Sequence, residues 1–378
     1  MCYHTPIAYL YMEKVIISSI EEYLQWTQIV SNLSRQKMLV LTLCAMLKSR
    51  SVVLSELAVH LNDSVKTDSN ETRLRDFFRE VEFDYDALAA FVLAFLVSQP
   101  FEKIRLTIDR TNWEFGAHST NILMVTASKG TYNIPLYWEL LDNEGGNSNS
   151  EQRIDILQKC IDLLGPERIG FILGDREFIG QIWLKFLKSK KILFCVRVPK
   201  HHIIETTDGQ KYSAEMVLQN RGQTTRFKHC MVDGVWGSAV ITKDAKGELL
   251  FLFGTANVHY LEQFYAKRWT IETIFHAFKS RGLNLEDTHL KINERLKKLI
   301  GLVSMAYAFC CSLGIFRHEK DKPIKKKNHK RKTKSFFRYG LDFIRDGFKK
   351  GYKYQEQWLN IFKEFIKFIF VNNSLSSS

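Results

Sequence analysis

Three carboxylates stand where they could support metal-assisted chemistry on a phosphate ester. Asp109 closes the strand-like run "LTIDRT", Asp175 closes "RIGFILGD", and Glu272 lies in a later helix-like run. Carboxylates at the ends of adjacent strands point into one crevice, and a helix packed there can add a third. Without cations such groups repel one another, and at least one takes up a proton. Two Mg²⁺ ions about 4 Å apart would balance the charge and permit an in-line phosphoryl displacement.

The choice of metal follows from the donor atoms. A site built only from carboxylate oxygens selects Mg²⁺, with Mn²⁺ as a substitute, over zinc.

The helix-like run "YAKRWTIETIFHAFK", residues 265–279, carries a polar stripe. Its polar members stand at offsets of three, seven and fourteen, so at roughly 100° per residue they project within about 60° of one another. They are Tyr265, Arg268, Glu272 and Lys279. Apolar residues supply a separate side of the helix, which is expected to pack against a core. It consists of Trp269, Ile271, Ile274, Phe275 and Phe278.

Simpler interpretations exist for each of these residues. A strand-terminal aspartate is commonly a cap or a turn former, and Glu272 with Arg268 could be only an i,i+4 surface pair worth a few tenths of a kcal/mol. Arg110 and Arg176 follow the two aspartates, and each could contact phosphate or form a buried structural pair.

The elements that must position these residues fall into five segments. Residues 1–98 read as helices. Residues 99–198 are expected to form three strands, then a helix, a strand, a second helix and a further strand. Residues 199–256 contain short β-rich runs between turn signals and read as an insertion. Residues 257–317 hold the striped helix, expected to begin near Val258, and an apolar helix, and residues 318–378 begin with a dense run of cations before further helices.

Charge and cysteine content narrow the class of protein. The formal net charge is +13, and the excess of cations favours an anionic partner, most often nucleic acid. The basic run "KDKPIKKKNHKRKTKSFFR" is interpreted as phosphate-binding, with a solvated loop or a localisation signal as the alternative. Seven cysteines without a Cys-x-x-Cys pair argue against a disulfide framework or a zinc ribbon and favour a reducing cytosol.

One stretch is apolar enough to be weighed as a membrane span. Residues 299–316 carry no charge over a length at the lower limit for crossing a bilayer. A helix enclosed in a large core is also apolar all round, and we expect residues 299–316 to form such a buried helix.

The three acids and the stripe together resemble a known family. The chain is similar to DDE transposases of the bacterial insertion-sequence group that carries a Y-(2)R-(3)E-(6)K signature, and "YAKRWTIETIFHAFK" matches that spacing in full. The run "LTIDRTNWEFG" resembles the block around the family's first aspartate, and "ILGDREFIG" the block around the second. The resemblance covers about residues 100–345.

The resemblance implies a fold, a reaction and roles for residues. The fold would be α/β, with an RNase H-like mixed sheet interrupted by a β-rich insertion and preceded by a helical DNA-binding domain. The reaction would be metal-dependent cleavage and strand transfer of double-stranded DNA. Asp109, Asp175 and Glu272 would be the catalytic metal ligands, and Tyr265, Arg268 and Lys279 would contact DNA near the transposon end.

The resemblance also implies partners and leaves alternatives open. It implies a homodimer on DNA in the bacterial cytoplasm, with no membrane association. Trp236 in the insertion could stack on a flipped base, or it could be a core residue. An inactive DNA-binding protein of the same fold and an RNase H-like nuclease without strand transfer remain the alternative functions.

Overall fold

The chain forms two compact units built from non-contiguous segments. The computed structural model describes residues 5–25, 27–96, 103–115, 118–130, 132–141, 146–221, 224–244, 246–328, 330–349 and 355–374. The first unit comprises Met1–Pro100, Trp113–Ser119 and Ile274–Ser378, and the second Phe101–Asn112 and Thr120–Thr273. The five segments expected from the sequence stay a prediction, and the predicted boundary at 98 lies outside the described residues.

The first unit is helical, as the sequence predicted for the N-terminal region. Its N-terminal helices are α1 (Thr5–Leu24), α2 (Leu33–Ser49), α3 (Leu54–Val59), α4 (Thr67–Glu80) and α5 (Tyr85–Ala94). Side-chain caps define two of the starts, since Asn32 accepts the backbone N–H of Arg35 at α2 and Asp84 accepts those of Asp86 and Ala87 at α5.

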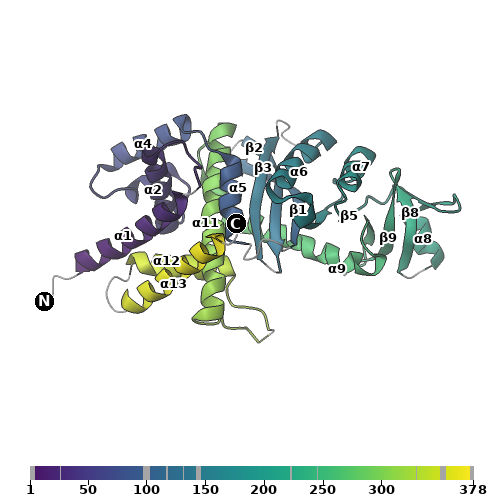
Figure 1. The fold of residues 1–378 in the computed structure, drawn as a ribbon. Coiled ribbons are helices and arrows are strands. Elements are labelled where there is room, and N and C mark those ends of the chain that lie inside the picture. Colours follow the sequence, from purple (N-terminus) through teal and green to yellow (C-terminus); the bar gives the residue numbers. More distant parts are fainter. Residues whose placement is uncertain are drawn as a thin grey trace. The chain divides into compact units, whose positions relative to one another are not determined.

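The long helix α11 (Asn293–Lys320) forms the centre of this unit. It packs against α2, α4, α5, α12 (Phe336–Lys349) and α13 (Gln355–Ser374), and Figure 1 shows it running the length of the helical unit. It is long and apolar enough to cross a bilayer, but its most apolar 18-residue window is 94% buried among the protein's own helices. This burial agrees with the prediction of a core helix.

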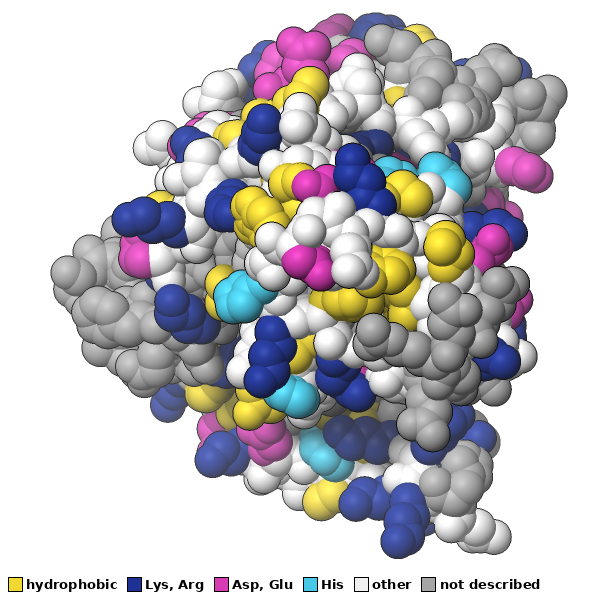
Figure 2. Space-filling model, turned by 90° about the vertical axis from the view of Figure 1, so that its right-hand side faces the viewer, with side chains coloured by type: hydrophobic (Ala, Val, Ile, Leu, Met, Phe, Trp, Pro, Cys, Tyr) yellow, Lys and Arg dark blue, Asp and Glu magenta, His cyan; other side chains and the backbone are white. Residues whose placement is uncertain are grey.

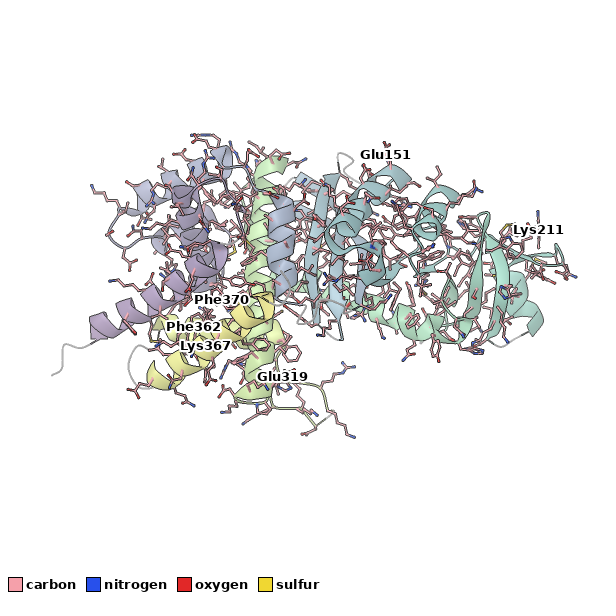
Figure 3. All side chains as sticks on the ribbon, in the orientation of Figure 1. Glu151, Lys211, Glu319, Phe362, Lys367 and Phe370 are labelled. Atoms are coloured by element: carbon pink, nitrogen blue, oxygen red, sulfur yellow. The ribbon has the colours of Figure 1, made fainter. Side chains whose placement is uncertain are left out.

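The last helix of the unit is amphipathic. Figure 3 labels Phe362 and Lys367 on α13, where the phenyl ring is fully buried and the lysine is exposed. The ring of Phe362 stacks on Trp358, whose indole N–H donates to the Phe343 carbonyl of α12. These contacts hold the C-terminal helices together.

The second unit is built on a mixed sheet. The strands of this sheet are β1 (Ile104–Phe115), β2 (His118–Lys129), β3 (Tyr132–Leu141), β4 (Ile169–Gly174), β5 (Phe194–Arg197), β6 (Ile203–Thr206), β7 (Lys211–Ser213), β8 (Thr225–Val232), β9 (Val235–Lys243) and β10 (Leu249–Gly254). The last residues of β1, from Trp113, and the first two of β2 belong to the first unit. Within the described residues the order of the strands is β3-β2-β1-β4-β5-β10-β9-β8-β6-β7. β1, β4 and β5 are parallel, whereas β10 joins β5 antiparallel.

The β-rich segment 199–256 continues the sheet of the core. Because β10 bonds directly to β5, the strands of this segment extend one continuous sheet, which can be followed from β5 to β9 and β8 in Figure 1. The segment also contains a helix, α8 (Ala214–Arg221), which the sequence analysis did not predict.

Two helices flank the core strands. α6 (Ser150–Leu164) starts with a reciprocal capping box between Asn149 and Gln152 and ends at Gly165. α7 (Gln181–Ser189) follows β4 in the sequence. A turn intervenes, closed by a hydrogen bond from the Phe178 N–H to the Asp175 carbonyl.

Candidate active site

Parallel pairing of β1 and β4 brings the two aspartates together. Thr107 pairs with Leu173, so two positions further along each chain Asp109 stands opposite Asp175 on the same face. The prediction that the first strand ends near Asp109 was wrong. β1 continues to Phe115 because its other neighbour, β2, is twice as long as β4. Asp109 therefore lies at the point where β4 ends, while its own strand goes on.

A buried apolar cluster seats the next helix, α9 (Leu261–Ala266), on the sheet. Leu261 is fully buried with Leu173, Cys195 and Leu252, and the Phe264 ring stacks on Phe171 at 4.4 Å between centroids. The close approach depends on a glycine. A Cβ at Gly254 would lie 2.2 Å from the Phe194 carbonyl oxygen and 2.9 Å from a Leu261 methyl group. The cluster thus sets the position of the helix that carries Tyr265.

The striped run is helical but irregular. α9 is followed by a 3-10 turn (Lys267–Trp269), by α10 (Thr270–His276) and by a π-helical turn (Ala277–Arg281). The expected start near Val258 is confirmed by a 3-10 turn, Val258–Tyr260, that leads into α9. Three of the four stripe residues, Tyr265, Arg268 and Glu272, belong to the second unit together with both aspartates.

The guanidinium of Arg268 is the hub of the site. Its Nη1 donates to Asp109 Oδ2 at 2.8 Å, and its Nη2 donates to Glu272 Oε1 at 2.8 Å and lies 3.9 Å from Asp175 Oδ2. The Tyr265 hydroxyl donates to the other oxygen of Asp175 at 3.0 Å. The three acids, far apart in the sequence, therefore meet around one cation.

Burial and charge act against each other at this hub. The side chains of Arg268 and Asp109 are 11% and 15% exposed, whereas that of Asp175 is 35% exposed, so the site opens on the Asp175 side. Burial raises the pKa of Asp109 to about 7, although Arg268 and the Arg110 backbone N–H oppose this rise. Burial also acts to lower the pKa of Arg268, but Asp109, Tyr265, Asp175 and Glu272 outweigh it and hold that pKa above its usual value.

A partly buried network of ion pairs and hydrogen bonds supports Asp109, and sequence reasoning missed most of it. The Arg110 backbone N–H donates to Asp109 Oδ1 at 2.8 Å, and the Arg110 guanidinium pairs with Glu177 at 2.8 Å. Glu177 also accepts from the Ser148 hydroxyl, to which Arg153 donates in turn. Of the two roles left open for Arg110, the structure shows the structural pair. The only sequence signal for Glu177 was its place in "GDREFIG".

Other predicted residues lie elsewhere. Lys279 belongs to the first unit, in the π-helical turn, and pairs with Glu286 at 3.4 Å, so its contact with DNA stays a prediction. Trp269 is 63% exposed, and the expectation that it packs the helix against a core was wrong. Helical spacing at roughly 100° per residue already puts Trp269 only about 40° from Tyr265, beside the polar stripe and away from the apolar side. Trp236 on β9 is 42% exposed, which rules out the core alternative.

Cations are scattered over the face that Figure 2 shows, and they are dense in one loop. In the view of Figure 2, Lys and Arg side chains are scattered across the face shown. Residues 320–334 of the first unit, here called the basic loop, form a turn closed by an antiparallel bridge between Lys326 and Lys332. Its described lysines and Arg331 are exposed, and Asp342 pairs with Lys334. This exposure agrees with either a phosphate-binding or a solvated loop.

The acid cluster suits a hard divalent cation by its chemistry. Three carboxylates against one guanidinium leave a net charge of −2 when all are ionised, and every candidate donor is an oxygen. Among the described residues, no group of three or more His, Cys, Asp or Glu is placed to hold a metal ion. Two nitrogens of Arg268 lie between these carboxylates, in the space that a metal ion shared by all three would occupy.

The central part of the chain matches one family. Residues 139–309 match the model described as Transposase DDE domain. The match runs from β3 into α11 and so includes Asp175 and Glu272 but not Asp109. It supports a DDE transposase family for this chain, and the mixed α/β architecture is consistent with an RNase H-like transposase fold. No curated protein sequence matches the chain.

Proposed function

We propose that this chain is a cut-and-paste DNA transposase of the insertion-sequence group with the Tyr-Arg-Glu-Lys signature. It would bind the terminal inverted repeats of its element, cleave the DNA and join the 3′ ends to target DNA. The observation that carries the proposal is the convergence of Asp109, Asp175 and Glu272 around Arg268 within one unit. The family match adds support, since it includes two of these acids.

Each residue of the site has a proposed role. Asp109, Asp175 and Glu272 would hold Mg²⁺, or Mn²⁺ in its place, and the bound metal would supply charge neutralisation and activation of a water or a 3′-hydroxyl. The Arg110 backbone N–H and the Tyr265 hydroxyl each fix one carboxylate oxygen, which orients Asp109 and Asp175. Arg268 would pass to a DNA phosphate once the acids have another cation, because its planar fork matches phosphate as well as carboxylate.

Surfaces outside the acid cluster would hold the DNA. The basic loop and the N-terminal helices are the proposed contacts to the element's ends, and Lys279 is a proposed contact to the backbone. Trp236 and Trp269 are both exposed aromatics on the second unit and could stack on an unpaired base. Because the reaction couples two ends, we propose a homodimer on DNA, acting in the bacterial cytoplasm.

The test uses the DNA that flanks the gene as substrate. A plasmid carrying both flanking segments is incubated with the purified chain, Mg²⁺ and a target plasmid. We expect cuts at inverted repeats in the flanks and joined products, and Asp109→Asn should bind the same DNA without cutting it. Joined products from Asp109→Asn at the wild-type rate would refute the proposed site.

Two further outcomes separate the alternatives. Cleavage without any joined product would indicate a nuclease. Binding without cleavage by both the wild type and Asp109→Asn would indicate a DNA-binding protein that has kept the fold and lost the chemistry.

A further inference from the structure

Arg268 supplies a positive charge among the three acids of the site. Its guanidinium touches all three acids, with two hydrogen bonds of 2.8 Å and an approach of 3.9 Å. The Arg268 side chain is 11% exposed, and its Cζ lies 5.7 Å from the centre of the Tyr265 ring. A guanidinium in this position cannot also contact a phosphate on the surface. The predicted contact with DNA therefore requires it to leave the acids.

We propose that Arg268 is an internal counter-cation that occupies the space between Asp109, Asp175 and Glu272 in the DNA-free chain and competes with divalent ions for these carboxylates. The inference rests on the proposed function and deepens it. Divalent ions and DNA would then bind cooperatively, because a phosphate that attracts the guanidinium frees the acids, and ions on the acids free the guanidinium.

The geometry explains why this competition would matter. Arg268 uses separate nitrogens for Asp109 and Glu272, so it holds their oxygens apart instead of gathering them around one point. An ion that binds through the two oxygens held by Arg268 can reach them only when these hydrogen bonds break. Their loss is subtracted from the binding free energy of the ion. The DNA-free chain would thus bind divalent ions weakly, which limits cleavage at the wrong place or time.

The test measures Mn²⁺ binding to the DNA-free chain by calorimetry at pH 8.5. Arg268→Gln removes the cation and keeps a polar side chain, and we expect it to bind Mn²⁺ about tenfold more tightly or better, equivalent to about 1.4 kcal/mol. Arg268→Lys keeps the charge but cannot donate to three acids from one plane. We expect it to bind about threefold more tightly than the wild type, which retains a test if Arg268→Gln does not fold.

A matched control corrects for the loss of charge. Arg226, in the same unit, pairs with Glu262 and touches none of the three acids. Arg226→Gln makes the same chemical change and should leave Mn²⁺ affinity at the wild-type value. Circular dichroism confirms that each variant is folded before titration.

The outcomes distinguish this inference from the proposed function. Wild-type or weaker Mn²⁺ affinity in both Arg268 variants overturns the counter-cation, while loss of Mn²⁺ binding in Glu272→Gln would leave the proposed metal site intact. If Mn²⁺ binds equally to the wild type and to Glu272→Gln, the acids hold no ion, and both the site and the counter-cation are refuted.

Discussion

Replacing Glu272 by glutamine separates a catalytic role from a structural one. The amide keeps the shape of the side chain and can still accept from Arg268, but it removes one of three negative charges from the site. The side chain is 26% exposed and its pair with Arg268 is a single i,i+4 contact, so we expect the free energy of unfolding to fall by about 1 kcal/mol or less. The effect on cleavage should be much larger, because Glu272 is a proposed metal ligand. We expect cleavage to fall by about a thousandfold, or roughly 4 kcal/mol of transition-state stabilisation.

Three measurements on the same protein test this separation. Cleavage of flank DNA is followed on gels, DNA affinity by fluorescence anisotropy, and unfolding by thermal melting. We expect DNA affinity to stay within about threefold of the wild type, because Glu272 itself makes no favourable contact with phosphate. The reasoning fails if cleavage stays within tenfold of the wild type, or if DNA affinity falls as far as cleavage does.

Three other perturbations test neighbouring parts of the argument. Tyr265→Phe removes the 3.0 Å hydrogen bond to Asp175 and should slow cleavage about tenfold to a hundredfold while DNA affinity stays constant; an equal loss of DNA affinity would instead show that the hydroxyl contacts the backbone. Because burial raises the folded-state pKa of Asp109 to about 7, the folded chain binds more protons than the unfolded chain between about pH 4 and 7, so in EDTA the free energy of unfolding should fall as pH rises through that window. Asp109→Asn should flatten this pH dependence, and an unchanged slope in denaturant titrations at pH 5 and 8 would contradict the assignment. Binding to duplex DNA should weaken by a factor of about 10³ or more between 50 and 200 mM salt if roughly six phosphates are contacted. Replacing Lys325, Lys326 and Lys327 by glutamine should reduce the slope of log affinity against log salt concentration. A flat salt response would remove the basis for phosphate binding by the basic loop.

The sequence by itself determined the order of elements around the site and the identity of its acids. The apolar alternation of β1 and the compact apolar run of β4 act over a few residues, so they can be read locally. The stripe of Tyr265, Arg268 and Glu272 follows from helical spacing alone, and the structure keeps it even though a 3-10 turn interrupts the helix. Trp269 was misplaced because the prediction counted it with the apolar side, although helical spacing at roughly 100° per residue puts it about 40° from Tyr265, beside the stripe.

Only the tertiary structure decided what surrounds those acids. The facing of Asp109 and Asp175 depends on the register between β1 and β4, which are separated by two strands and a helix in the sequence. The burial that raises the Asp109 pKa comes from long-range packing, as does the pair of Arg110 with Glu177, to which the Ser148 hydroxyl donates. Sequence spacing placed Arg268 on the same face as Glu272. That its guanidinium would enter the acid cluster depends on α9 being seated on the sheet by Leu261 and Phe264, and no local pattern encodes such a distance.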